Sequence, residues 1–172
     1  LATLSVASAQ VSIDRPYAVG ADTSWLQSQE ARGTQFSDRG EAGDALDILR
    51  DNGFNYIRLR LFVNPRSELG YSQRDGYCDL EHTLVMAKRI KEAGMYFLLD
   101  FHYSDNWADP QKQIMPQAWQ TYSYDEVCQA VYEHTRDVLV ALDAQGTAPD
   151  MVQVGNEVSN GMLWPYGSVR HS

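Results

Sequence analysis

The residues best suited to chemistry stand at the end of one short apolar run. Residues 151–154 read Met-Val-Gln-Val, typical of a strand buried in a parallel sheet, and Asn156 and Glu157 follow after one glycine. The carboxyl ends of strands are where β/α-barrel enzymes hold their catalytic groups. A carboxyl group at such a position can give and take protons, so Glu157 is a candidate general acid/base. The alternative is that Glu157 only begins the next loop.

Ionisable residues also stand in or just after three earlier predicted strands, at residues 17–24, 54–63 and 95–101. Side chains alternate between the two faces of a strand, so the large apolar residues of the second and third strands share one face and the charged residues share the other. The ionisable residues predicted to face the same side are, in chain order, Asp22, Arg58, Arg60, Asp100, His102 and Glu157. One buried Arg–Asp pair is usually structural, and a lone histidine is usually a core residue. Ionisable residues on the same side of all four predicted strands are harder to explain in this way, so the pattern favours a functional site.

Three amphipathic helices are predicted between these strands. The first follows a polar loop at residues 36–40, and its apolar face consists of Ala42, Ala45, Leu46 and Leu49. Asp79 is a good N-cap for the second helix, and Ser123 with Glu126 forms a capping box for the third. A glycine follows the last turn of each helix, at Gly53, Gly94 and Gly146.

Four strands joined by three crossover helices make a parallel sheet, which could belong to a doubly wound fold or to a barrel. Doubly wound nucleotide-binding folds carry a Gly-rich phosphate loop after the first strand. Residues 20–25 read Gly-Ala-Asp-Thr-Ser-Trp there, with the carboxylate of Asp22 where a phosphate would lie. The sequence therefore predicts an α/β fold that forms the N-terminal half, about the first four strands, of a (β/α)8 TIM barrel. Because such a barrel takes about 250 residues, we expect an incomplete chain; a half-barrel that dimerises is the alternative.

The connection after the third strand is unusually long, at roughly twenty residues, and loops of this length are usually functional or disordered. It carries Trp107 and Trp119, so it could wall a cleft, and Trp164 is another aromatic residue just past the end of the fourth strand. A metal site that joins His102 to Asp105 or Asp109 is an alternative, because oxygen-rich loops hold Ca²⁺, although the spacing is not diagnostic.

The composition excludes several classes of partner. The 172 residues carry a formal charge of −9 and are 44% hydrophobic and 11% aromatic, enough for one sizeable core. Without a basic stripe, neither nucleic acid nor an anionic membrane is expected as a partner. No run of about 20 apolar residues is present to span a membrane. Cys78 and Cys128 could pair or stay free.

The first nine residues read Leu-Ala-Thr-Leu-Ser-Val-Ala-Ser-Ala, with Ala7 and Ala9 in an A-x-A pattern. This pattern predicts that residues 1–9 are the remnant of a signal peptide, and hence that the protein is secreted or periplasmic. A disordered tail is the alternative. Residues 10–172 are then expected to form the partial (β/α)8 catalytic domain.

Four groups of residues, in their order and spacing, resemble one known family. They are Gly-Ala-Asp-Thr-Ser at 20–24, Tyr-Ile-Arg-Leu-Arg-Leu-Phe-Val-Asn-Pro at 56–65, Asp-Phe-His-Tyr-Ser-Asp-Asn-Trp-Ala-Asp-Pro at 100–110, and Gly-Asn-Glu at 155–157 with Gly-Met-Leu-Trp-Pro at 161–165. Over residues 17–167 the chain resembles family 53 of the glycoside hydrolases, the arabinogalactan endo-β-1,4-galactanases acting on galactan side chains of pectin. The third motif is long and quite specific, whereas Asn-Glu is shared by many barrel glycosidases.

The resemblance implies a (β/α)8 barrel and retaining hydrolysis by two glutamates, which follow strands four and seven. Glu157 matches the proton donor and acid/base, whereas the nucleophile is absent from this chain, so the fragment alone is predicted to be inactive. Arg58 matches the arginine that keeps the nucleophile ionised, and Asn156 matches the residue that contacts the sugar beside the scissile bond. The residues expected to bind substrate are Asp22, Arg58, Arg60, His102, Asp105, Trp107, Asn156 and Trp164.

The resemblance also implies that no cofactor is needed, that these residues hold no metal, that a structural Ca²⁺ is possible in the missing half, and that β-1,4-galactan is the partner. Two features depart from the family pattern. Phe62 stands where the family often has tryptophan, and residues 68–77 are longer and more polar than usual. The alternative function is a noncatalytic carbohydrate-binding half-barrel, and a glutamate on a seventh strand would decide between the two.

Overall fold

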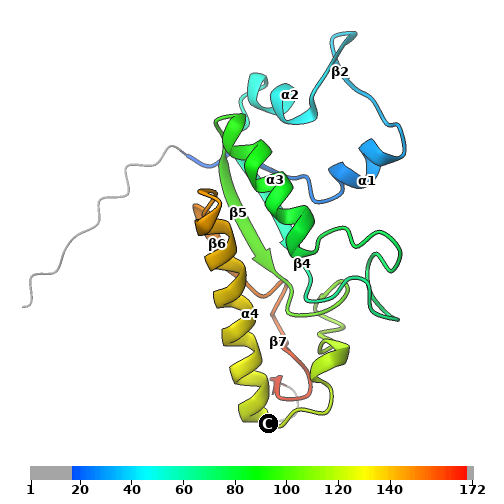
Figure 1. The fold of residues 1–172 in the computed structure, drawn as a ribbon, viewed down its shortest axis with the longest axis vertical. Coiled ribbons are helices and arrows are strands. Elements are labelled where there is room, and N and C mark those ends of the chain that lie inside the picture. Colours follow the sequence, from blue (N-terminus) through cyan, green and yellow to red (C-terminus); the bar gives the residue numbers. More distant parts are fainter. Residues whose placement is uncertain (1–16, 170–172) are drawn as a thin grey trace, which may run out of the picture.

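The computed structural model describes residues 17–169 (Figure 1). The predicted signal-peptide remnant, residues 1–9, lies outside the described residues. At the centre is a parallel sheet in the order β1-β4-β5-β6. Its strands are β1 (Gly20–Asp22), β4 (Tyr56–Leu61), β5 (Tyr96–Phe101) and β6 (Met151–Val154). Two antiparallel hairpins stand apart from this sheet, namely β2 (Phe36–Asp38) with β3 (Glu41–Gly43) and β7 (Gly161–Met162) with β8 (Gly167–Ser168).

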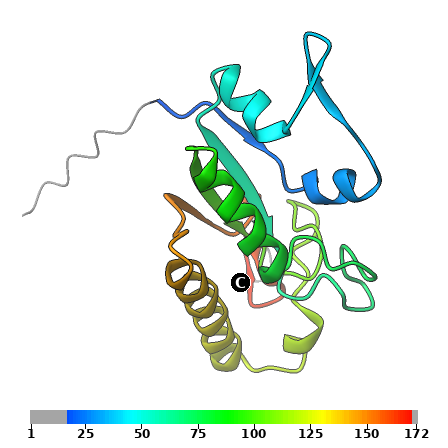
Figure 2. The ribbon, with the colours of Figure 1, turned by 45° about the horizontal axis from the view of Figure 1, so that its top comes forward.

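The two long helices lie next to each other along one face of the sheet (Figures 1 and 2). They are α3 (Leu80–Glu92) and α4 (Tyr124–Ala144). The predicted caps of both are confirmed. Asp79 accepts a hydrogen bond from the backbone of His82, and Ser123 and Glu126 form a reciprocal capping box. These caps fix the residue at which each helix begins, and therefore how the helix lies on the sheet.

The predicted division of the strands into two faces is confirmed. On the helix-covered face, Ile57, Leu61, Phe97, Leu99 and Phe101 are fully buried. Burying a side chain of this kind contributes roughly 1.5–3 kcal/mol, so this layer is the main source of stability for the sheet. The opposite face carries polar residues, which are described with the site below.

Two short helices and a hairpin fill the connection between β1 and β4. The helix α1 (Leu26–Ala31) and the β2–β3 hairpin were not predicted, and the prediction of a polar loop at residues 36–40 is wrong. The helix α2 is Ala45–Asp51, so the prediction that Ala42 lies on its apolar face is also wrong. The helix begins later because the side chain of Asp44 caps it, accepting from the backbone nitrogen of Leu46 at 2.8 Å.

The strand β6 is an edge of the sheet within the described residues. Its residues Met151, Val152 and Val154 are 45%, 38% and 60% exposed, so the prediction that this strand is buried is wrong for the chain as described. The apolar composition of β6 is that of a strand covered by neighbours, and its free edge has unpaired backbone groups.

Two further expectations concern the chain as a whole. Among the described residues, no helix is both long and apolar enough to cross a membrane. Cys78 is buried and Cys128 is exposed, and both are free thiols.

His134 is an unusual residue on the sheet-facing side of α4. Its ring makes edge contacts with Phe101, Tyr103 and Trp119, at centroid distances of 5.9, 6.3 and 6.2 Å. Its buried Nε2 has no hydrogen-bond partner among the described residues. Burial lowers the pKa of His134 to about 4, and the nearby charge of Asp137 opposes this only in part.

We predict that His134 makes the fold less stable in acid. Its folded-state pKa, about 4, lies below the ordinary value of 6.5, so folding favours the neutral ring. The stabilisation is therefore complete above pH 6.5 and is lost as the pH falls toward 4, by at most about 3 kcal/mol. Urea unfolding between pH 7.5 and 4.5 should show a smaller loss for His134→Gln than for the unaltered chain. Parallel pH profiles for the two proteins would contradict this account.

Candidate active site

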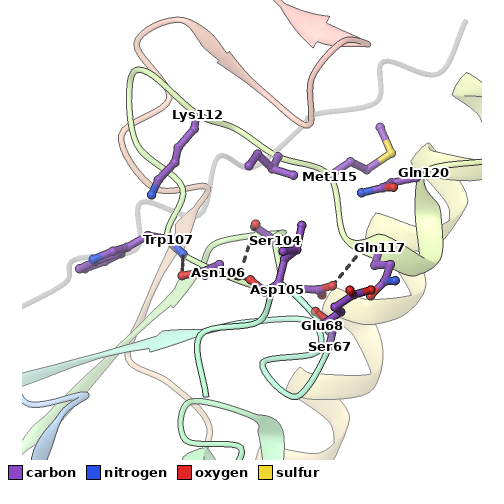
Figure 3. Close-up of a pocket in the computed structure, with 12 residues that line it drawn as sticks. Ser67, Glu68, Ser104, Asp105, Asn106, Trp107, Lys112, Met115, Gln117 and Gln120 are labelled. Atoms are coloured by element: carbon purple, nitrogen blue, oxygen red, sulfur yellow. Dashed lines mark hydrogen bonds between the residues drawn. The ribbon is translucent and has the colours of Figure 1, made fainter. Parts of the chain in front are cut away.

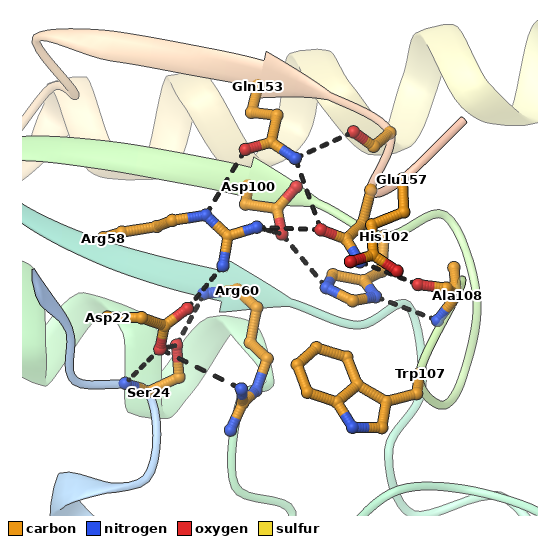
Figure 4. Close-up of polar contacts among 12 residues, drawn as sticks. Asp22, Ser24, Arg58, Arg60, Asp100, His102, Trp107, Ala108, Gln153 and Glu157 are labelled. Atoms are coloured by element: carbon orange, nitrogen blue, oxygen red, sulfur yellow. Dashed lines mark hydrogen bonds and ion pairs between the residues drawn. The ribbon is translucent and has the colours of Figure 1, made fainter. Parts of the chain in front are cut away.

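The polar face of the sheet is organised around the guanidinium of Arg58 (Figure 4). Its Nη1 pairs with Asp22 Oδ2, and its Nη2 lies 2.5 Å from Asp100 Oδ2. The same Nη2 donates to Asn156 Oδ1 at 2.9 Å, and Nε donates to Gln153 Oε1 at 3.3 Å. One side chain from β4 thus contacts β1, β5, β6 and the turn after β6. Apart from Gln153, all of these residues were predicted to belong to the site.

The strand register explains why these side chains meet. Asp22 is the direct neighbour of Arg58 across β1 and β4, and Asp100 is the direct neighbour of Gln153 across β5 and β6. Residues directly opposite each other in a sheet point to the same face, so the network needs no distortion of the strands. Gln153 could have been recognised as the polar residue in the middle of an apolar strand.

Asp100 and His102 form the buried part of this cluster. Both side chains are 0% exposed, and His102 Nε2 lies 3.0 Å from Asp100 Oδ2. The contact is poorly aligned for a hydrogen bond, so it acts mainly through electrostatics. His102 Nδ1 accepts from the backbone nitrogen of Ala108 at 3.1 Å, which leaves the hydrogen of the neutral ring on Nε2, facing the carboxylate. This hydrogen bond attaches the loop after β5, here termed the β5 loop, to the polar face.

The turn after β6 holds Asn156 firmly and leaves Glu157 open to solvent. Asn156 is 6% exposed; its Nδ2 donates to the carbonyl of Ala108 at 2.7 Å, and its own carbonyl accepts from Gln113 Nε2 at 2.8 Å. Glu157 has φ +49 and an exposed side chain. Within the described residues its carboxylate makes no hydrogen bond or ion pair, so Glu157 is held through its backbone and its neighbour.

The direction of the Glu157 side chain was expected to follow from the alternation of side chains along the strand, but the structure differs. The strand ends at Val154, and Gly155 follows with φ +82. A Cβ at Gly155 would lie 2.6 Å from Val158 Cγ1, so this turn requires glycine. The turn, rather than the strand, therefore sets the direction of Glu157.

Asp105 was predicted to bind substrate, but its carboxylate connects loops instead. It is 6% exposed, its Oδ1 accepts from the backbone nitrogen of Asn64, and its Oδ2 accepts from that of Gln117, both at 3.0 Å. The alternative metal site is not supported either, because Asp109 Oδ1 is occupied by the backbone nitrogens of Gln111 and Lys112. The described residues contain no group of three or more histidine, cysteine, aspartate or glutamate side chains that could hold a metal ion.

The predicted aromatic residues come from two loops: Trp107 belongs to the loop after β5, and Trp164 follows β6. Trp107 is 40% exposed, and its ring covers the guanidinium of Arg60 at 4.4 Å. Trp164 is partly buried, and its Nε1 donates to the carbonyl of Asn160 at 3.1 Å. The backbone nitrogen of Trp164 donates to the carbonyl of Gln113 at 2.9 Å, which joins the turn after β6 to the β5 loop.

A pocket of about 400 Å³ opens between the loop after β4 and the loop after β5 (Figure 3). Its lining residues include Asp105 and Trp107 from the predicted site. The others are Ser67, Glu68, Leu69, Ser104, Asn106, Lys112, Ile114, Met115, Gln117 and Gln120. Sequence reasoning did not single these residues out, and the only signal was the length of the two loops.

Comparison with known proteins assigns the family. The model of glycosyl hydrolase family 53 matches residues 18–171, so the chain belongs to this family. The arabinogalactan endo-beta-1,4-galactanase of Cellvibrio japonicus is 37% identical over 168 residues, which are 97% of this chain and 43% of that protein. A probable arabinogalactan endo-beta-1,4-galactanase A of Aspergillus terreus is 43% identical over 150 residues, 87% of this chain and 41% of that protein.

Solved structures give the same fold. The GH53 catalytic domain of Ignisphaera aggregans superposes with a TM-score of 0.83 at 42% identity, over 92% of this chain and 45% of that one. A structure from work on two fungal beta-1,4-galactanases superposes with a TM-score of 0.81 at 36% identity, over 90% and 44%. The chain thus spans less than half of the length of these relatives and forms the N-terminal part of the (β/α)8 barrel, as predicted.

We predict that Arg58 stabilises the fold through Asp100. Arg58→Met leaves a fully buried carboxylate without its cation, which should cost roughly 3–5 kcal/mol in the free energy of unfolding. Arg89 is the matched control, because its side chain is equally exposed, at 26%, and also pairs with two carboxylates, Glu30 and Asp44. Both partners of Arg89 reach solvent, so Arg89→Met should cost about 1 kcal/mol. Equal losses in urea unfolding would contradict the special role of Arg58.

Proposed function

We propose that this chain belongs to an endo-acting retaining glycoside hydrolase that cleaves β-1,4-galactosidic bonds in the galactan and arabinogalactan side chains of pectin. One observation carries the proposal: Asn156 and Glu157 stand together at the carboxyl end of β6, with the amide of Asn156 held by Arg58 at 2.9 Å. The activities named for the relatives from Cellvibrio japonicus and Aspergillus terreus support the same substrate.

In the proposed reaction Glu157 is the acid/base. It gives its proton to the glycosidic oxygen as the leaving group departs, and then takes a proton from the water that attacks the glycosyl–enzyme intermediate. Its exposed side chain is accessible to a glycosidic oxygen of a substrate. Asn156 has one amide hydrogen beyond the one given to Ala108, which suits a hydrogen bond to a sugar hydroxyl.

Retaining hydrolysis also needs a second carboxylate, about 5 Å from the first, as nucleophile. Asp22 and Asp100 are poor candidates for separate reasons. Two strands, at about 4.8 Å a spacing, separate β1 with Asp22 from β6, and the side chain of Asp100 is 0% exposed. The family resemblance implies that the nucleophile is a glutamate after the seventh strand, and this chain spans 41–45% of the relatives compared. We infer that Arg58 also helps to keep that glutamate ionised.

We further propose that the protein is secreted or periplasmic, where polymeric pectin is accessible. The support is the A-x-A pattern at Ala7 and Ala9.

The first test separates the chain from the complete site. We predict that the 172 residues alone release no reducing ends from galactan, because they carry only one of the two carboxylates. Fusion to the matching carboxyl-terminal segment of the Cellvibrio japonicus relative, here termed the completed chain, should restore hydrolysis. Turnover by the 172 residues that Glu157→Gln abolishes would contradict this prediction and indicate a catalytic half-barrel dimer.

The second test assigns the proton donor. In the completed chain, Glu157→Gln should lower turnover of galactan by roughly 10²–10⁴-fold, because a poor leaving group needs its proton. The loss should be much smaller for an aryl galactoside whose leaving group departs without protonation. Glu92→Gln, at an exposed glutamate of α3, is the matched control and should change neither rate. Equal losses on the two substrates would exclude Glu157 as the acid.

A further inference from the structure

Arg60 lies behind an aromatic surface rather than on it. Its side chain is 8% exposed, although it stands on the polar face of β4, two residues from Arg58. Its guanidinium carbon lies 4.4 Å from the centroid of the Trp107 ring and 5.3 Å from that of Tyr71. These two rings lie against the cation and account for its burial, and Figure 4 shows the indole of Trp107 beside the guanidinium.

We propose that Arg60 is a positioning residue, which holds the indole of Trp107 as a flat platform for a galactosyl ring and so acts on the substrate only through Trp107. The inference rests on the proposed function for the identity of the sugar. It replaces the expectation that Arg60 binds substrate directly, because the side chain is 8% exposed and its guanidinium lies against the rings of Trp107 and Tyr71.

The contacts of Arg60 fix the plane of its guanidinium. One terminal nitrogen donates to Tyr71 Oη at 3.2 Å, and the other lies 3.9 Å from Asp22 Oδ1. The backbone nitrogen of Arg60 donates to Ser24 Oγ at 2.9 Å. A planar cation held in this way attracts an aromatic face by cation–π interaction and defines the ring's tilt, which a lysine ammonium would not do.

Trp107 also has contacts other than Arg60, and they come from the loop after β5 and its surroundings. Its ring is 5.1 Å from the ring of His102, and its backbone nitrogen donates to Asn106 Oδ1 at 2.8 Å. The loop that carries Tyr71 is joined to the β5 loop, because the Tyr71 nitrogen donates to the carbonyl of Asp105 and Asn106 Nδ2 donates to the carbonyl of Leu69, both at 2.9 Å. The long polar segment at residues 68–77 therefore contributes to the pose of Trp107.

The chemistry of the platform favours a particular sugar. Pyranoses stack their C–H faces on aromatic rings while their hydroxyl groups stay hydrated. In a galactosyl unit the axial 4-hydroxyl points away from the face of H3, H4 and H5, so these C–H groups form one continuous apolar patch. In a glucosyl unit, H4 lies on the face opposite H3 and H5. A rigid indole therefore recognises galactosyl units better than one that rotates freely.

The test measures two properties of the completed chain: the pose of the Trp107 ring and the affinity for galactotetraose. The variants are Arg60→Met, Arg60→Lys and Trp107→Ala, together with the double variant of Arg60→Met and Trp107→Ala. Trp107→Phe assigns the indole N–H resonance of Trp107 by its disappearance. Arg60→Met should shift that resonance and weaken galactotetraose binding by about tenfold, and Arg60→Lys should do the same to a smaller extent. In the Trp107→Ala background, Arg60→Met should have no further effect on binding.

Three results would overturn the inference. If Arg60→Met weakens binding equally with and without Trp107, Arg60 binds the sugar itself; if neither resonance nor affinity changes, Arg60 has no role in the site. If Arg60→Met does not fold, Tyr71→Leu is the second variant. It removes one of the two rings that contact the guanidinium of Arg60 and should shift the same indole resonance. Binding does not require hydrolysis, so binding that depends on Arg60 in a completed chain without activity on galactan would support the inference and refute the proposed function. A chain that binds no galactotetraose would overturn the platform.

Discussion

The buried carboxylate of Asp100 is the constraint on which the polar face depends. A carboxylate with 0% exposure is costly unless a cation and hydrogen bonds compensate for its lost hydration, and Arg58 is the cation that contacts it. Because Arg58 also contacts Asp22, Gln153 and Asn156, the compensation of one charge fixes four segments relative to one another. The helix-covered face supplies most of the apolar burial, whereas the polar face defines how the carboxyl ends of the strands meet.

The two arginines of β4 have different roles on the polar face of the sheet. Arg58 connects strands through ion pairs, and its contact with Asn156 sets the start of the turn that presents Glu157. Arg60 connects loops through aromatic rings, because Tyr71 and Trp107 belong to the loops after β4 and β5. Alternation along a strand gives both side chains the same face, yet their different depths of burial give one an electrostatic role and the other a packing role.

The sequence was sufficient wherever local rules decide the structure. Alternation predicted the two faces of β4 and β5, and the caps at Asp79 and Ser123 predicted where α3 and α4 begin. It was insufficient where distant contacts decide. The carboxylate of Asp105 looked available, but the backbone nitrogens of Asn64 and Gln117 occupy it, and no local pattern indicates such partners. The β2–β3 hairpin was missed because short strands with few large apolar residues have no clear period.

The most direct measurement of the central claim, that this polar face presents Glu157 as the acid/base, is chemical rescue in the completed chain. Glu157→Ala removes the base that activates water, but an anion such as azide needs no base to attack a glycosyl–enzyme intermediate. With an activated aryl galactobioside, azide should therefore raise turnover many-fold and yield a glycosyl azide of retained β configuration. A variant whose rate does not respond to azide, or whose azide product is inverted, would contradict the account.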